Sequence, residues 1–185
     1  YAQARFDDAA AVRAAIAHDL GAAVRAPVEA ALVEARDFGA LRIAELPGVS
    51  LDDLQLEIAD YGPPQPLHLR ADARAPQVEE ALATQAFRSN CPVTGQPDWA
   101  AVQIRYAGAP IDHAGLLRYL VSFRQHAGFH ESCVERIFTD IMARCAPRAL
   151  SVYARFTRRG GLDINPWRAT PGFGAPPPNL RGARQ

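Results

Sequence analysis

Residues 78–107 read VEEALATQAFRSNCPVTGQPDWAAVQIRYA, and the other elements of the chain can be placed relative to them. Within this stretch, Cys91 lies among Asn, Pro, Thr and Gly residues, which are typical of tight turns. The segment after the turn alternates apolar and polar residues and predicts a strand, whereas residues 78–87 fit either a helix or a strand. If they form a strand, the stretch is a strand–loop–strand unit with Cys91 and Asp98 at its tip.

The loop brings a thiol and a carboxylate into one short segment. Asp98 follows Cys91 by seven residues. A thiol with an acid beside it has the ingredients of a covalent nucleophile and a proton donor, and loops at strand ends often carry such chemistry. A cysteine in a turn is nevertheless more often without a function, and Asp beside Pro is a common turn former. The residues alone leave both interpretations open.

The composition is that of a globular chain with no overall charge. With 185 residues and 49% hydrophobic content, the chain can bury the core of one ordinary domain or two small ones. Twenty basic residues balance twenty acidic ones, so no overall field draws the protein toward nucleic acid or a membrane. Every basic residue is Arg, which excludes a Schiff-base lysine and a P-loop lysine.

The cysteine pattern argues against a disulfide framework. Cys91, Cys133 and Cys145 show no CxxC spacing, so the sequence predicts neither a disulfide scaffold nor a cysteine-based zinc site. We expect Cys133 and Cys145 to be small core residues of a helix, and the protein to work in a reducing cytoplasm. There is no HExxH motif, so no metal is required, and no GxGxxG follows a strand, so no Rossmann cofactor site is predicted.

The N-terminal part is predicted to contain a helix and two strands. Apolar residues recur every four positions in residues 7–24, which predicts an amphipathic helix with an aspartate cap. Residues 27–38 predict a strand, and the alternation of apolar and polar residues in 51–61 predicts another. The prolines of residues 61–76 mark the best candidate for a domain boundary. The chain begins without Met directly before a helix, so we expect it to start within a domain of a longer protein, and no apolar run approaches the ~20 residues that span a bilayer.

From Val78 onward the elements follow a definite order. After the first two strands we expect a helix in residues 112–128, a helix from Glu131 to Pro147, strands at 150–157 and 162–167 joined by a turn, and an extended Pro- and Gly-rich tail at 169–185. The order strand, strand, helix, helix, strand, strand implies an α+β fold in which two helices cover one face of an antiparallel sheet.

Two further clusters have both a functional and an ordinary interpretation. Glu131 precedes a helix with Phe129 and His130, where a carboxylate most simply compensates the helix dipole. Arg158 and Arg159 stand before two glycines, where they fit either a bidentate phosphate clamp or a solvated hairpin. For these residues taken alone, the ordinary interpretation is favoured.

Three long motifs connect these clusters. They are SNCPVTGQPDW, IDHAGLLRYLVSFRQHAGFHESCVERIF and LSVYARFTRRGGLDINPWR. Together they strongly resemble the C-terminal half of the longer, two-module NADPH-dependent 7-cyano-7-deazaguanine reductases, the nitrile reductases of queuosine biosynthesis, a tRNA modification. The resemblance continues with less force through the first 75 residues.

The resemblance implies a fold and an organisation. The family has the tunnelling fold (T-fold), and its longer form carries two such modules in tandem. Residues 1–74 are then the remainder of the first module, and residues 75–185 are the second module with the catalytic cysteine and the tail. The family's lysine-bearing motif, of the form ESKSFKLY, is expected just before Tyr1. Because that motif contributes to both binding sites in the family, we expect little or no turnover from these 185 residues alone.

The resemblance also implies roles for individual residues. Cys91 matches the nucleophile that forms a covalent thioimide with the nitrile carbon, and Asp98 matches the general acid. The remaining matches are Phe129, His130 and Glu131 for the substrate, and Arg158, Arg159 and Gly160 for NADPH. The family also implies no metal, no direct contact with nucleic acid or a membrane, and a homodimer.

Two alternatives stay open. One is another T-fold enzyme of purine or pterin chemistry, such as a cyclohydrolase-like protein, which usually needs a metal held by Cys and His. The zinc content of the purified protein would discriminate it from a reductase. The other is a non-catalytic T-fold module, against which the presence of both Cys91 and Asp98 argues.

Overall fold

The computed structural model describes residues 1, 3–175, 177–178 and 180–185. They form two compact units, Tyr1–Arg42 and Ile43–Gln185. The first unit contains the helix α1 (Ala9–Val24) and the 3₁₀ helix η1 (Ala35–Ala40), and none of its described residues is buried. The predicted N-terminal helix is confirmed, but its predicted amphipathic character is not, because none of its described residues is buried and Leu20 and Val24 are exposed. As expected, it is capped by an aspartate, because Asp8 accepts a hydrogen bond from the backbone N–H of Ala11.

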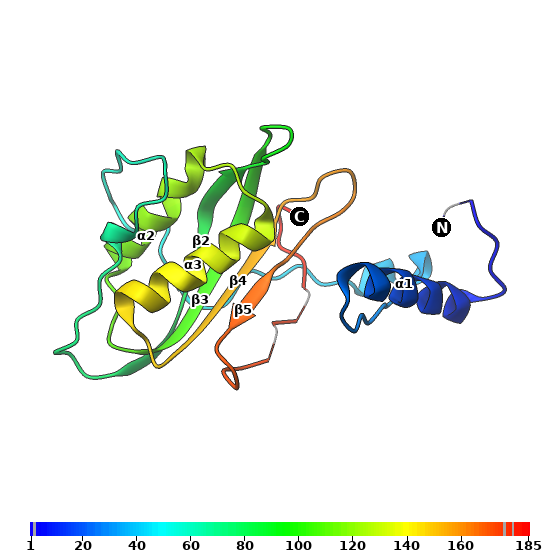
Figure 1. Ribbon diagram of the computed structural model, residues 1–185, viewed down its shortest axis with the longest axis horizontal. Helices are drawn as coiled ribbons and strands as arrows, with labels where there is room; N and C mark the ends of the chain where they lie inside the picture. Colours follow the sequence, from blue (N-terminus) through cyan, green and yellow to red (C-terminus); the bar gives the residue numbers. More distant parts are fainter. Residues whose placement is uncertain (2, 176, 179) are drawn as a thin grey trace. The chain divides into compact units, whose positions relative to one another are not determined.

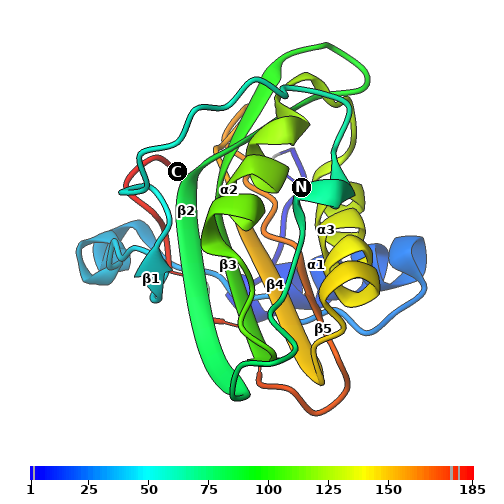
Figure 2. The ribbon, with the colours of Figure 1, turned by 90° about the vertical axis from the view of Figure 1, so that its left-hand side faces the viewer.

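The second unit is built on a mixed five-stranded sheet. Its strands are β1 (Val49–Ser50), β2 (Val78–Asn90), β3 (Pro97–Gly108), β4 (Ala149–Phe156) and β5 (Trp167–Ala169), in that order across the sheet. β1 pairs in parallel with β2, and every other neighbouring pair is antiparallel. The helices α2 (His113–Val121) and α3 (His130–Cys145) lie on one face of this sheet, with the 3₁₀ helix η3 (Ser122–Gln125) between them (Figures 1 and 2). A short 3₁₀ helix, η2 (Pro66–His68), precedes β2. The α+β fold predicted for a T-fold module is confirmed.

The central hairpin resolves the ambiguity of residues 78–87 in favour of a strand. β2 continues through Asn90, so the loop that joins it to β3 is limited to residues 91–96. Alanine and glutamate favour helix, but pairing along β3 overrides that local preference. In β3 the alternate residues Ala100, Val102 and Ile104 are buried toward the helices. Asp98 is the first residue of that buried row, which explains why a carboxylate at a strand end points inward.

Two predicted strands of the N-terminal half are wrong. Residues 27–34 form no regular element and residues 35–40 form η1, because no neighbouring strand supplies a ladder for them. Only Val49–Ser50 pairs in the region of the second predicted strand. Residues 54–60 have no ladder either, but Leu54, Leu56 and Ile58 still pack against the core. The period-two pattern therefore identified the buried face correctly without a strand.

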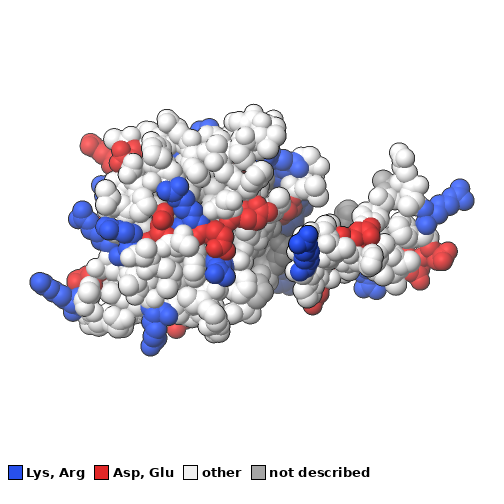
Figure 3. Space-filling view, viewed as in Figure 1, with Lys and Arg blue, Asp and Glu red and all other residues white. Residues whose placement is uncertain are grey.

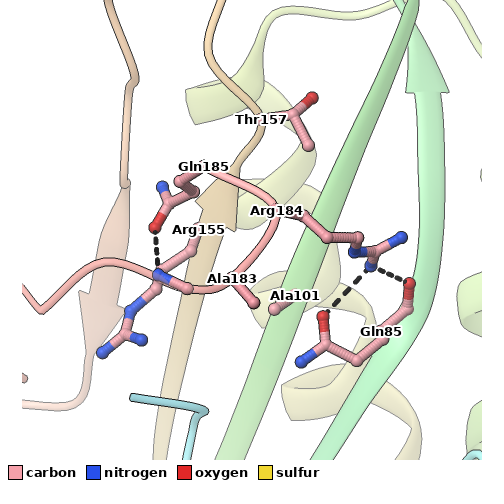
Figure 4. A pocket seen from close by; sticks show the side chains of 8 residues that line it. Gln85, Ala101, Arg155, Thr157, Ala183, Arg184 and Gln185 are labelled. Atoms are coloured by element: carbon pink, nitrogen blue, oxygen red, sulfur yellow. Dashed lines mark hydrogen bonds between the residues drawn. The ribbon is translucent and has the colours of Figure 1, made fainter. Parts of the chain in front are cut away.

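The C-terminal predictions needed smaller corrections. The last strand was predicted at 162–167 but begins only at Trp167, because Pro166 has no N–H to donate to a ladder. The tail was predicted to be extended, but its final residues return to the sheet. There the side chain of Gln185 donates to the backbone oxygen of Phe156. Figure 4 shows how Arg184 donates to the backbone oxygen of Gln85. Pro176 and Asn179 of this tail lie outside the described residues.

The largest buried side chains are aromatic and lie between the sheet and the helices. Phe87 of β2 contacts Phe123 and Phe156, and Tyr119 contacts Phe123 edge-on. Cys133 and Cys145 are buried in α3, which confirms their predicted place in the core.

The surface and the domain boundary complete the description. On the face shown in Figure 3, basic and acidic side chains are interspersed. None of the helices among the described residues is long and apolar enough to span a membrane. The boundary between the two compact units, at Arg42, reflects how the residues pack and does not test the predicted module boundary. The division into modules between residues 74 and 75 therefore stays a prediction.

Candidate active site

The loop between β2 and β3 is closed by its own backbone. The N–H of Cys91 donates to the carbonyl of Gln96 at 2.8 Å, and the N–H of Gly95 donates to the carbonyl of Cys91 at 2.9 Å. Gly95 has a φ of 70°, in the left-handed region that favours glycine. The sequence CPVTGQ therefore folds into a compact turn that places the Cys91 side chain at the end of the sheet.

The Cys91 thiol is activated by its neighbours. The hydroxyl of Thr94, the guanidinium of Arg159 and the backbone N–H groups of Thr94 and Val93 interact favourably with its sulfur. These donors lower the pKa of Cys91 to about 6, against a smaller opposing effect of burial. At neutral pH the side chain is therefore mainly a thiolate.

The pKa of Cys91 leads to a selective-labelling prediction. We expect iodoacetamide to alkylate Cys91 with a midpoint near pH 6, because the thiolate fraction increases as the pH rises through the thiol pKa. Cys91 is only 7% exposed, but it lines the pocket, whereas Cys133 and Cys145 do not and have their pKa raised by burial to about 11, so both should stay unmodified in the folded protein at pH 8. Peptide mass mapping across a pH series measures all three sites in one sample. A midpoint near the ordinary thiol value of about 8.5 would contradict the assignment.

Asp98 is a buried acidic side chain between an arginine and a histidine. Its side chain is 2% exposed, and its two oxygens lie 3.0 Å from Nε of Arg159 and 3.3 Å from Nε2 of His130. The oxygen beside Arg159 forms an ion pair but accepts no directed hydrogen bond, because the N–H does not point along it. That oxygen retains capacity to exchange a proton with a ligand.

His130 is held by a ring stack. It is the first residue of α3, and its imidazole lies parallel to Phe156 of β4, with the ring centroids 3.8 Å apart and an interplanar angle of 4°. The imidazole is nearly buried, and its Nδ1 has no hydrogen-bond partner within the described residues. The stack fixes the ring so that Nε2 faces Asp98.

These groups line one pocket of about 210 Å³. It lies below the roughly 300–1,000 Å³ range typical of ligand pockets, which suits a small fused ring. Its lining residues are Cys91, Pro92, Asp98, Gly128, Phe129, His130, Glu131, Arg159 and Ile164. The pocket thus brings together six of the predicted site residues: Cys91, Asp98, Phe129, His130, Glu131 and Arg159. Arg158 and Gly160 lie outside its lining.

Three contributors were missed from the sequence. Thr94 and Gln96 accept hydrogen bonds from Nη1 of Arg159 at 3.3 and 3.1 Å, and Ile164 forms part of the pocket wall. Thr94 was recognised only as a turn former. Nothing in the local pattern shows that its hydroxyl accepts from Arg159, because that contact joins residues 65 positions apart along the chain.

Asn90 connects the nucleophile loop to the start of α3. Its N–H donates to the carbonyl of His126 at 2.8 Å, and its carbonyl accepts from the N–H of Gly128 at 3.1 Å. Its side chain donates to the carbonyl of Arg124 at 3.2 Å and accepts from Arg88 at 2.9 Å. Every polar group of this residue is thus used, and three of the four hydrogen bonds join the segment before Cys91 to the segment before Phe129.

The turn formed by residues 158–161 has features that fit the phosphate groups of an anionic cofactor. Arg158 is exposed and makes no ion pair with any described residue. Gly160 and Gly161 have φ values of 58° and 86° with open space beside them, so a phosphate can approach their backbone. Arg158 and Gly160 fit phosphate groups in this way, whereas the donors of Arg159 are directed at the Cys91 loop.

Two other kinds of site among the described residues are less suited to bind a ligand. The described residues contain no group of three His, Cys, Asp or Glu side chains that could hold a metal ion. A pocket between the C-terminal tail and the sheet, lined by Gln85, Arg184 and Gln185 among others, has a volume of about 10 Å³ (Figure 4). That volume suits about one water molecule and no larger ligand.

Comparisons with known proteins agree on one family. A family model described as "QueF-like protein" matches residues 97–172. The NADPH-dependent 7-cyano-7-deazaguanine reductase of Bordetella pertussis is 57% identical over 185 residues, which cover 99% of this chain and 66% of that protein. The protein of the same name from Burkholderia multivorans is 55% identical over 186 residues, covering 100% of this chain and 67% of the relative. The chain thus spans about two thirds of the length of these relatives.

A solved structure is also similar to part of this chain. It is the archaeosine synthase QueF-Like in the apo form, with 18% sequence identity and a TM-score of 0.47. The match covers 55% of this chain and 100% of that one.

Proposed function

The chain belongs to the family of NADPH-dependent 7-cyano-7-deazaguanine reductases, and on that premise we propose that it reduces the nitrile of 7-cyano-7-deazaguanine to an aminomethyl group in queuosine biosynthesis. One observation carries the proposal: an activated thiol, a buried carboxylate and a glutamate line the same small pocket. A nitrile needs a soft nucleophile at carbon and a proton at nitrogen, and these groups supply both.

Cys91 is the proposed nucleophile. Its thiolate adds to the nitrile carbon, which forms a C–S bond and converts the C≡N triple bond to a C=N double bond. A thiolate is suited to this step because it is strongly nucleophilic at neutral pH without a separate base. The product of the step is a thioimide that stays bound to the chain.

Asp98 is the proposed proton donor. The nitrile nitrogen takes a proton from Asp98 in its carboxylic acid form, which leaves Asp98 as a carboxylate, and the Asp98 oxygen that accepts no hydrogen bond faces the same pocket as the sulfur. His130 lies on the other oxygen and fixes the orientation of the carboxylate. The carboxylate is thus held in one geometry relative to the sulfur.

Phe129, His130 and Glu131 are proposed to bind the substrate ring. The Glu131 carboxylate can accept hydrogen bonds from the N–H donors of a guanine-like edge, and it is exposed at the pocket while His130 is nearly buried. Phe129 is 58% exposed beside it, so it can lie against a planar base and cover the pocket.

NADPH is the proposed reductant, and two NADPH molecules bound in turn would supply one hydride each, the first for the thioimide and the second for the imine that follows. Arg158 and Gly160 would hold its phosphates, since one is an unpaired cation among the described residues and the other has open backbone. Between the two reductions the sulfur of Cys91 leaves as a thiolate, which its donors stabilise.

We also propose the compartment, the oligomeric state and the partners of the protein. The mechanism needs Cys91 as a free thiol, which favours a reducing cytoplasm. A homodimer and the absence of direct contact with nucleic acid or membranes are also proposed.

Intact mass spectrometry tests the proposed chemistry directly. 7-Cyano-7-deazaguanine is added without NADPH, and the expected result is a mass increase of one substrate molecule per chain. The measurement is repeated on a chimera that carries the N-terminal third of the Burkholderia multivorans relative before Tyr1. If neither protein forms an adduct, the proposed function is wrong.

Replacing Asp98 with asparagine should separate proton transfer from binding. We expect adduct formation to slow by roughly 10²- to 10⁴-fold, the usual contribution of a general acid, while the Kd for the substrate changes little. Asn keeps the shape of the side chain but cannot donate the same proton. Stopped-flow measurement of adduct formation and equilibrium titration of substrate binding give the two numbers. An equal loss in both would show that Asp98 only supports binding.

A further inference from the structure

We propose that Arg159 is a catalytic residue of this site, whose guanidinium holds the Cys91 sulfur as a thiolate and fixes it next to Asp98. The inference deepens the proposed function and rests on it for the identity of the electrophile. Family resemblance implied only a cofactor-binding role for this residue, and the geometry points to a second one.

The contacts of Arg159 converge on the nucleophile loop. Its Nη1 lies 3.1 Å from Oε1 of Gln96 and 3.3 Å from Oγ1 of Thr94, while its Nε lies 3.0 Å from Oδ1 of Asp98. The same guanidinium lines the pocket together with Cys91, and its favourable interaction with the thiolate helps to lower the pKa of Cys91. One planar group therefore joins the nucleophile, its loop and the proposed acid, in the fork geometry that distinguishes Arg from Lys.

The surrounding charges show why this contact matters. Asp98 and Glu131 face the same pocket, and each disfavours a negative charge on sulfur whenever it is ionised. His130 is directed at Asp98, and in the structure only Arg159, among the described pocket residues, is a permanent cation. Removing Arg159 would leave the sulfur facing carboxylates with the hydroxyl and backbone donors of the loop as its remaining support.

Arg158 provides a matched contrast. It precedes Arg159 directly, carries the same charge and is exposed, but it does not line the pocket and makes no ion pair within the described part of the chain. A general effect of positive charge in this turn would act from both residues, whereas a specific contact with sulfur acts only from Arg159.

The test is the pH dependence of Cys91 alkylation by iodoacetamide, followed by peptide mass mapping. In R159Q and R159M we expect the midpoint to rise by about 1 pH unit, because the hydroxyl of Thr94 and the backbone donors of the loop remain, and in R158Q we expect it to stay near that of the unmodified protein. The midpoint is the readout, because a more basic thiolate is intrinsically more reactive and partly offsets the loss in rate. Two replacements of different polarity are used so that a folded variant is available, and circular dichroism checks each one.

Three outcomes would overturn the inference. These are midpoints in R159Q and R159M within about half a pH unit of the unmodified protein, an equal shift in R158Q, or a midpoint near 8.5 before any substitution. The assay contains no nitrile, so its result is independent of the substrate. If the alkylation midpoint rises in R159Q as expected but no nitrile adduct forms, the proposed function is wrong, and the effect of Arg159 on the Cys91 thiolate is still supported.

Discussion

A chain with alanine at position 91 is expected to form no covalent adduct with 7-cyano-7-deazaguanine and to lose nitrile reduction by a factor on the order of 10⁴ or more. Cys91 supplies the atom that bonds to the nitrile carbon, and no other thiol can replace it. Cys133 and Cys145 are buried, and burial raises their pKa to about 11. Intact mass spectrometry measures the adduct, and NADPH oxidation measures turnover in the N-terminally extended chimera.

The controls distinguish loss of chemistry from loss of structure. Cys145→Ala makes the same substitution at the far end of α3 and should leave adduct formation unchanged. Cys91→Ser keeps the size of the side chain but replaces the thiolate with a hydroxyl that stays protonated at neutral pH, so it should be as inactive as the alanine variant. Adduct formation by Cys91→Ala would show that another group carries the reaction.

The second large effect concerns stability. Phe156→Ala is expected to lower the free energy of unfolding by about 3–5 kcal/mol, as for other buried Phe to Ala replacements. Phe156 has no exposed surface, contacts Phe87 edge-on with ring centroids 6.0 Å apart and stacks on His130. Its removal leaves a cavity at the point where β4, β2 and α3 meet. Urea denaturation followed by circular dichroism gives the change.

A matched variant limits the interpretation of that result. Phe38→Ala removes the same ring from a side chain that is 56% exposed, so it should change the unfolding free energy by less than about 0.5 kcal/mol. Phe156→Leu should recover much of the loss of Phe156→Ala, because it refills most of the volume, but it cannot restore the ring stack with His130. A loss below 1 kcal/mol in Phe156→Ala would contradict the packing described here.

The sequence predicted the parts of the fold that depend on local pattern. The alternation in AVQIRYAG identified β3, and the N-cap Asp112 correctly marked the start of α2, where it accepts from the N–H of Ala114. The order of elements after Val78 then defined the sheet and its helices. Residues 27–38 and 51–61 failed for a common reason: a strand needs a partner, and the presence of a partner is decided by distant parts of the chain.

The residues of the candidate site also divide into those that the local sequence identifies and those that only tertiary packing brings to the site. Cys91 and Asp98 were identified from neighbouring letters, and the structure brings them into one pocket. The functional roles of these residues remain predictions. Arg159 was interpreted as part of a hairpin or a cofactor clamp, because no local pattern indicates that the turn after β4 reaches the loop after β2. Contacts of this kind come from tertiary packing and become visible only in three dimensions.

Asn90 has a practical consequence for engineering. Three of its four hydrogen bonds tie Asn90 to residues 124–128, so the segment that leads into Cys91 is joined directly to the segment that leads into α3. Transferring the turn 91–96 alone into another scaffold would break these hydrogen bonds. The orientation of the Cys91 thiol relative to Glu131 would then no longer be defined. A graft that carries both segments together preserves the spacing, which makes the pair, and not the turn, the minimal transferable unit of this protein.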